Sequence, residues 1–241
     1  MKPLRDRIRN KKALCFIDLE GTQLSHEIIE IGAYRVTLKK DGSFSKVYPP
    51  FKRYVIPKHR IGSFVTKLTG ITEKQIDREA ISYRQMLNDF VKYLGRDFES
   101  TLFIAYGNQD GAMFTHSAEN NLDASEEISR RISKNVFDFS AFLGAYLRSE
   151  SNNIYSLEHA CEHFNISFQG QAHDALADAK NLMLLYQKVD EQPELVAKEY
   201  KRTLTTAPQT PRPLRILLRK LKEKKTITEQ DWDEAILESL K

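Results

Sequence analysis

FIDLEGT, residues 16–22, follows the apolar triplet ALC at 13–15. Its β-branched and aromatic content is typical of a strand, yet it contains two acids, Asp18 and Glu20. Residues two apart in a strand point to the same face, so both carboxylates face one side and the apolar residues between them face the other. Burying unpaired carboxylates costs several kcal/mol. The stretch therefore predicts either a cation bound between Asp18 and Glu20 or a polar, half-exposed strand face.

The rest of the chain shows a mixed pattern of strands and helices. Strands are expected at 13–19, 26–40, 47–56, 101–107 and 135–139, the third with a bulge or an exposed edge at Pro49 and Pro50. Helices are expected at 83–94, within 110–134, and at 139–147, 156–164 and 176–189. This order predicts an α/β fold whose mixed sheet combines a three-strand antiparallel meander with parallel strands and is flanked by helices.

Charge divides the chain into three parts. Residues 1–12 form a basic N-terminal segment, 13–192 a main domain, and 193–241 a linker with a basic helical tail. Residues 198–225 contain ten Lys or Arg and two acids. Such an excess of cations either contacts phosphates or is only solvated, and charge alone leaves both open.

The tail is expected to begin with an extended linker at 203–213, rich in proline and threonine, followed by a basic amphipathic helix at 214–225. A last helix follows, with Thr228 and Asp231 forming a capping box. Its apolar face consists of Trp232, Ala235, Ile236 and Leu240. We expect this face either to fold back on the main domain or to bind a protein partner or a second copy of the chain.

Composition limits the class of protein. The chain has 241 residues, 41% of them hydrophobic, and no apolar run near the ~18 residues that a membrane span needs. Its first residues lack the apolar centre of a signal peptide. Cys15 and Cys161 lie in apolar patterns and are expected to be reduced core residues. These features predict a soluble cytoplasmic protein without a membrane partner.

Two further segments favour a bound cation over a polar, half-exposed strand face. Asp110 follows the apolar strand at 101–107, at the kind of strand end where α/β folds bind ligands. His173 precedes the helix at 176–189, and Asp178 lies in its early turns. Each has an ordinary alternative, since acids are common near helix N-termini and histidines are common in loops.

In combination, these segments resemble the DEDDh (DnaQ-like) 3′-to-5′ exonucleases, the group that includes the epsilon proofreading subunit, RNase T and oligoribonuclease. The shared pattern is Asp-x-Glu on a first strand, an Asp after a middle strand, and a His five residues before an Asp on a late helix. IIEIGAYRV (28–36), FVTKLTGIT (64–72) and the block at 156–181 also match. The resemblance covers roughly residues 13–190.

Within this family, the motif residues are most similar to those of the branch that contains the enhanced-RNAi exonucleases and the bacterial sporulation-inhibitor homologue. Gly21 and Thr22 follow the motif glutamate, resembling that branch's Glu-Ala-Thr. Tyr106, Gly107 and Asn108 resemble its aromatic-Gly-Asn pattern.

The resemblance implies an RNase H-like fold and hydrolysis with two Mg²⁺ or Mn²⁺ ions. Asp18, Glu20, Asp110 and Asp178 would hold the two ions, as expected for oxygen ligands and hard cations. His173 would be the general base, because histidine is the side chain whose charge changes nearest to neutral pH. The products would be nucleoside 5′-monophosphates released from the 3′ ends of single-stranded RNA or DNA, with RNA slightly favoured by the branch.

The resemblance also implies which residues bind the substrate. The backbone around Leu19, Gly21 and Thr22 would meet the terminal sugar, and Leu68 would wedge beside the last base. Phe64 could stack on a base, and Asn108 belongs to the same expected binding set. Packing in the core or in loops is the alternative role for each of these residues.

Two competing interpretations remain. His159 and His163 have the i, i+4 spacing of a zinc site but lack a third ligand in the expected relation, so we interpret them as surface residues. A non-catalytic nucleic-acid- or protein-binding regulatory module on the same fold is the alternative function.

Overall fold

The computed structural model describes residues 1–206 and 210–239. It divides into two compact units. Unit 1 consists of Met1–Ser140 and Ser156–Glu191, and unit 2 of Ala141–Tyr155 and Gln192–Lys241. The tail was expected to begin at residue 193, and the second segment of unit 2 begins at Gln192.

Unit 1 contains a mixed sheet with strand order β3-β2-β1-β5-β6, in which β4 also pairs with β2. The strands are β1 (Ala13–Gly21), β2 (Ile28–Leu38), β3 (Phe44–Val47), β4 (Phe51–Tyr54), β5 (Thr101–Ala105) and β6 (Val136–Asp138). β2 is antiparallel to β1, β3 and β4, while β5 is parallel to β1 and β6. The predicted combination of an antiparallel meander with parallel strands is confirmed.

The expected third strand at 47–56 is wrong in one respect. The chain forms two short strands there, β3 and β4, which both pair with β2, and residues 48–50 between them are not strand. Pro49 and Pro50 lack the backbone N–H that a ladder needs, so they interrupt the strand instead of bulging it.

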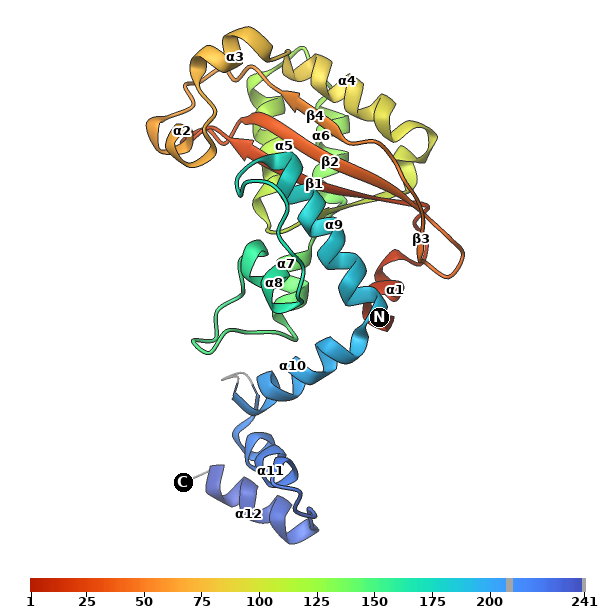
Figure 1. Cartoon of the computed structure of the whole chain (residues 1–241), viewed down its shortest axis with the longest axis vertical. Coiled ribbons are helices and arrows are strands. Elements are labelled where there is room, and N and C mark those ends of the chain that lie inside the picture. The colour runs from red at the N-terminus through yellow and green to blue at the C-terminus, as the bar shows by residue number, and fades with distance from the viewer. Residues whose placement is uncertain (207–209, 240–241) are drawn as a thin grey trace. The chain divides into compact units, whose positions relative to one another are not determined.

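The helices of unit 1 cover both faces of the sheet (Figure 1). They are α1 (Lys2–Ile8), α2 (Ser63–Thr69), α3 (Glu73–Glu79), α4 (Tyr83–Leu94), the 3₁₀ turn η1 (Gly95–Ser100), α5 (Gln109–Asn120), α6 (Glu126–Lys134), α8 (Leu157–His163) and α9 (Ala175–Glu191). α7 (Phe139–Gly144) begins in unit 1 and ends in unit 2.

The two faces of β1 pack differently. Ile17 and its neighbours at alternate positions belong to a buried cluster with Phe90 of α4, Phe103 of β5 and Phe114 of α5. Phe16 points the other way, and its ring meets Tyr186 of α9 edge-on at 5.3 Å between centroids. The period of two that the sequence predicted is confirmed, and it places Asp18 and Glu20 on the α9 face.

The expected environment of the cysteines is also confirmed, since Cys15 and Cys161 are free and buried. The basic N-terminal segment forms α1, which buries Leu4 and Ile8. Its Arg5 Nε donates to Asp190 Oδ1 at 2.8 Å.

Besides the non-helical residues 145–155, the described part of unit 2 consists mainly of helices. Besides the end of α7 they are α10 (Pro193–Thr206), α11 (Arg212–Lys222) and α12 (Glu229–Ser239). Residues 203–206 were expected to be an extended linker and are instead helical. Thr203 is buried there, and its Oγ1 donates to the Tyr146 carbonyl at 2.9 Å.

The predicted capping box at the start of α12 is confirmed, because the Thr228 backbone N–H donates to Asp231 Oδ2 at 2.8 Å. α12 packs on α11, and Ala235 is buried while Trp232 remains 42% exposed. Leu240 lies outside the described residues. Within the described residues, no helix combines the length and apolar character required for a membrane span.

Candidate active site

The acidic pair lies near the end of β1, on the face that α9 covers. Glu20 pairs with Glu30 across the β1–β2 ladder, and the register shifts between Glu20 and Gly21. A Cβ at Gly21 would lie 2.3 Å from Met113 Cε, so the strand end packs against the side chain of a residue on α5. The strand end therefore stands between α5 and α9.

Asp110 reaches the same end of the sheet from α5. β5 runs parallel to β1, and α5 begins four residues after β5 ends. Asp110 lies in the first turn of α5 and is 9% exposed. The Leu19 backbone N–H hydrogen-bonds to the Asp110 carboxylate, which ties this acid to β1.

His173 and Asp178 come from the N-terminal end of α9. The His173 backbone has a φ of 65° and donates its N–H to Asp178 Oδ2 at 2.9 Å. His173 Nδ1 lies 3.9 Å from Glu20 Oε1. Potential ligand atoms of Glu20, His173 and Asp178 all lie within 4.8 Å of one another.

Asp18 lies within the same electrostatic environment. Its pKa is raised well above the usual value, first by burial and then by the charges of Asp110, Asp178 and Glu20. The structure therefore brings the five sequence-predicted catalytic residues together from three separate parts of the chain.

The other acids share this perturbation. Burial, followed by the charges of Glu30 and Asp178, raises the pKa of Glu20 to about 8. Burial raises the pKa of Asp110 to about 7 and that of Asp178 to about 6, although the backbone hydrogen bond from His173 opposes the rise for Asp178. Carboxylates crowded in this way repel one another, and a cation among them would relieve the repulsion.

The donor set fits a hard divalent cation. The four acids offer carboxylate oxygens, which Mg²⁺ and Mn²⁺ prefer, and none of the four is a thiol or thioether ligand of the softer metals. Burial raises the pKa values of these acids, and for Asp18 and Glu20 the neighbouring carboxylates raise them further, so a cation among them would favour their charged forms. These observations are consistent with the metal ions that the sequence implied.

The expected base-contacting residues stand on α2, beside the strand end. Phe64 is 62% and Leu68 40% exposed, so both side chains are accessible to a ligand. Gly70 ends α2 with a φ of 78°, a left-handed conformation that favours glycine. Leu24, in the loop between β1 and β2, is 89% exposed and was not predicted.

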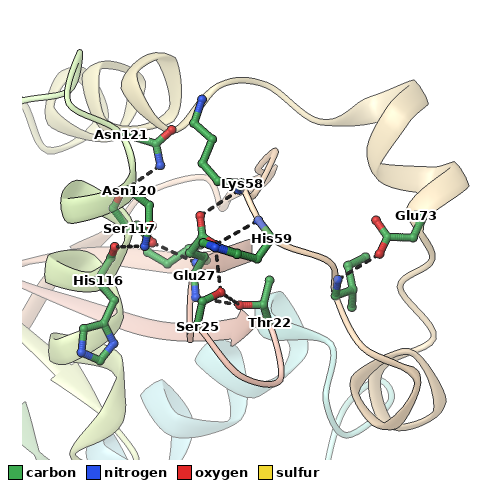
Figure 2. Close-up of polar contacts among 12 residues, drawn as sticks. Thr22, Ser25, Glu27, Lys58, His59, Glu73, His116, Ser117, Asn120 and Asn121 are labelled. Carbon is green, nitrogen blue, oxygen red and sulfur yellow. Dashed lines mark hydrogen bonds and ion pairs between the residues drawn. The ribbon is translucent and has the colours of Figure 1, made fainter.

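A buried carboxylate, Glu27, holds this side of the site together (Figure 2). Its oxygens accept hydrogen bonds from Ser25 Oγ at 2.8 Å, from the Lys58 N–H at 2.8 Å and from the His59 N–H at 3.2 Å. Glu27 is 1% exposed. It therefore joins the loop between β1 and β2 to the segment that leads into α2.

Leu19 and Thr22 do not present their side chains to the site. Leu19 packs in the core, and Thr22, 1% exposed, accepts the Glu27 N–H at 3.0 Å through its Oγ1. Their backbones lie beside Glu20 and Gly21, which is the part that the sequence analysis expected to meet a sugar.

Asn108 lines a pocket of about 310 Å³ along the first turns of α5. Its other lining residues are His26, Gln109, Ala112, Met113 and His116. The Nδ1 atom of His116 is buried and has no hydrogen-bond partner among the described residues. Neither histidine belongs to a local motif, so the sequence alone did not indicate them.

A second polar network was also missed. Glu30, Lys52 and Asp174 form ion pairs beside the acidic cluster. Glu30 could have been found by the argument used for the first strand, because it is an acid within the apolar run IIEIG. Nothing in the local sequence marks Lys52.

His159 and His163 belong to no group of three or more potential metal ligands in the described part of the chain. His159 Nδ1 lies 2.9 Å from Ser156 Oγ, at the start of α8.

Comparison with known proteins gives a consistent family assignment. The family model described as an exonuclease of the RNase T type matches residues 15–186. A DNA polymerase III of PolC type from Caldanaerobacter subterraneus subsp. tengcongensis is 30% identical over 166 residues, which are 68% of this chain and 10% of that protein. The chain thus spans about a tenth of the length of this curated relative.

Solved structures show the same fold. The nuclease domain of 3′hExo, a DEDDh family member bound to rAMP, has a TM-score of 0.61 and 19% identity, over 76% of this chain and 93% of that one. E. coli exonuclease I in complex with a dT13 oligonucleotide has a TM-score of 0.58 and 18% identity, over 80% of this chain and 44% of that one.

Proposed function

The chain belongs to the RNase T-type exonuclease family, and from that premise we propose that it is a metal-dependent 3′-to-5′ exonuclease of single-stranded nucleic acid. The observation that carries the proposal is the convergence of Glu20, His173 and Asp178 within 4.8 Å. β1 and α9 are more than 150 residues apart in the sequence, so only the tertiary fold brings these side chains together.

Asp18, Glu20, Asp110 and Asp178 are the residues that would hold two Mg²⁺ or Mn²⁺ ions. Bound there, the ions would offset negative charge on the attacking and leaving oxygens of an in-line displacement at phosphorus. The raised pKa values of these acids support the assignment, since a bound cation would favour their charged forms.

His173 is the proposed general base. Its side chain is 48% exposed, so water can reach it, and its Nδ1 lies 3.9 Å from Glu20. The imidazole takes a proton from the water that attacks phosphorus. The bond from phosphorus to the 3′ oxygen of the preceding nucleotide breaks, and that oxygen is protonated as the nucleoside 5′-monophosphate leaves.

The strand end and α2 are the proposed binding site of the 3′-terminal nucleotide. The backbone at Leu19, Gly21 and Thr22 meets the sugar, and the exposed Leu68 and Phe64 contact the base. Stacking of a base on an aromatic ring contributes about 1–3 kcal/mol. Asn108 and the pocket that it lines contact the nucleic acid beside the first turns of α5.

RNA is the slightly favoured substrate, on the ground of the branch similarity at Gly21–Thr22 and 106–108. The 3′hExo structure contains rAMP and the exonuclease I structure contains dT13, so the fold is compatible with either sugar. We also propose that residues 13–192 are the exonuclease domain, and that the basic tail holds longer strands or a protein partner.

The test uses 5′-labelled single strands of matched RNA and DNA sequence with Mn²⁺. Stepwise shortening from the 3′ end is expected, and Asp18→Asn should abolish it. Asp123→Asn, at an exposed loop position between α5 and α6, is the matched control and should retain full activity. Binding without any shortening would contradict the proposal and favour the non-catalytic module.

A further inference from the structure

Glu30 is a further buried acid, near the start of β2 and next to the acidic cluster. It lies directly opposite Glu20 in the antiparallel ladder, and its side chain is 2% exposed. Facing residues in such a ladder place their side chains on the same face. Glu30 therefore lies on the same face of the sheet as Asp18 and Glu20, and its charge raises the pKa of Glu20.

Lys52 provides the positive partner of Glu30. It lies on β4, which pairs with β2 so that Lys52 faces Gly32, two residues from Glu30. The Lys52 ammonium is 2.7 Å from Glu30 Oε1 and 2.6 Å from Asp174 Oδ2. One lysine thus bridges a carboxylate on the sheet and a carboxylate at the start of α9.

Asp174 connects this bridge to the first turn of α9. Its Oδ1 accepts the Leu176 and Ala177 N–H groups, each at 3.0 Å, while Oδ2 binds Lys52. The Asp174 carbonyl accepts the Asp178 N–H at 2.9 Å. Because His173 is the preceding residue, the position of Asp174 determines where both His173 and Asp178 stand.

The same turn is in backbone contact with the sheet. A Cβ at Gly32 of β2 would lie 2.2 Å from the carbonyl carbon and oxygen of Ala175. The Ala175 N–H points to Glu30 Oε2 at 3.4 Å. Because of this contact, the first turn of α9 cannot move closer to β2. The ion pairs of Lys52 restrict its movement in the other directions.

We propose that Lys52 is a positioning residue of the exonuclease reaction: by bridging Glu30 and Asp174 it holds the first turn of α9 where His173 and Asp178 meet Glu20. This inference rests on the proposed function and adds to it a residue that touches neither the metal ligands nor the substrate. It predicts that Lys52 affects metal binding and turnover more than substrate affinity.

The experiment compares Lys52→Met with Lys52→Arg, using Lys46→Met as control. Lys46 is an exposed lysine on β3 whose ammonium lies 4.7 Å from the ring centre of Tyr48. Mn²⁺ affinity is measured by calorimetry, kcat and KM on an oligonucleotide, and the melting temperature without metal. Lys52→Met should lower kcat and Mn²⁺ affinity by about 10- to 100-fold each, the range typical of residues that orient metal ligands, with KM changed less than about threefold.

Lys52→Arg should recover most of both losses, since a guanidinium can span the same two carboxylates, and Lys46→Met should match the wild type. Lys52→Met also leaves Glu30 buried without a partner, so the double variant Lys52→Met with Glu30→Gln removes that unpaired charge. We expect the double variant to regain the wild-type melting temperature but not kcat or Mn²⁺ affinity.

Recovery of kcat and Mn²⁺ affinity together with the melting temperature in the double variant would overturn the proposal, since Lys52 would then act on stability alone. The calorimetry separates this failure from failure of the proposed function. A wild-type protein that hydrolyses no strand would refute the exonuclease assignment, whereas equal Mn²⁺ affinity in wild type and double variant would refute the role of Lys52.

Discussion

Raising the pH of the metal-free protein from about 5 to about 8 should destabilise it. Burial and neighbouring charges raise the pKa of Glu20 from 4.5 to about 8 in the folded protein. One pKa unit corresponds to about 1.4 kcal/mol, so ionised Glu20 costs the folded state up to about 5 kcal/mol. Asp178, whose pKa rises from 3.8 to about 6, adds a cost in the same direction.

The sign follows from the protons that each state binds. Between pH 4.5 and about 8, folded Glu20 retains a proton that the unfolded chain has released. The free energy of unfolding therefore falls as the pH rises through this window and is level above it. Below pH 4.5 Glu20 is protonated in both the folded and the unfolded state, so it does not destabilise the folded state there.

Urea denaturation in EDTA at pH 5, 6, 7 and 8 measures the effect. We expect a fall of several kcal/mol in the free energy of unfolding, which saturating Mn²⁺ should reduce by favouring the ionised carboxylates. Glu20→Gln should remove much of the fall, whereas Asp123→Asn, at an exposed loop position, should retain it. A free energy of unfolding that is level across this range in EDTA would refute the argument that these carboxylates are crowded without a counterion.

Three further outcomes are expected. His173→Gln should lower kcat by about 10²- to 10⁴-fold, the range of general base catalysis, and a normal kcat would rule out His173 as the base. Glu27→Gln should lower the free energy of unfolding by about 1–3 kcal/mol, because one of the two buried acceptor oxygens becomes a donor; an unchanged urea midpoint would contradict this role. Gly32→Ala should lower both the melting temperature and kcat, since its Cβ would meet the Ala175 backbone at 2.2 Å; normal values for both would show that α9 can move away.

The acidic motif of β1 was predictable because it depends on a local rule. Side chains alternate along a strand, so FIDLEGT alone places Asp18 and Glu20 on one face and Ile17 on the other. The capping box of Thr228 and Asp231 is local in the same sense and was also predicted. Prediction was less successful at residues 48–50, where the local rule for proline permits either a bulge or an interruption of the strand.

The tail shows how burial can override local preference. Residues 203–206 have a threonine-rich sequence that favours an extended linker, yet they complete α10. The Thr203 hydroxyl is buried against the Tyr146 carbonyl, and this contact involves a segment more than 50 residues earlier in the chain. A local pattern contains no information about such a partner.

By itself, the sequence determined the family and predicted the five candidate site residues, four acids and His173, because both depend on residue types and spacings within short segments. Only the tertiary structure decided that Lys52 joins Glu30 to Asp174. That contact requires β4 to pair with β2 and α9 to pack on the sheet at Gly32. Strand pairing and helix packing depend on residues that are distant in the chain. No local motif therefore indicates that Lys52 lies beside the candidate active site.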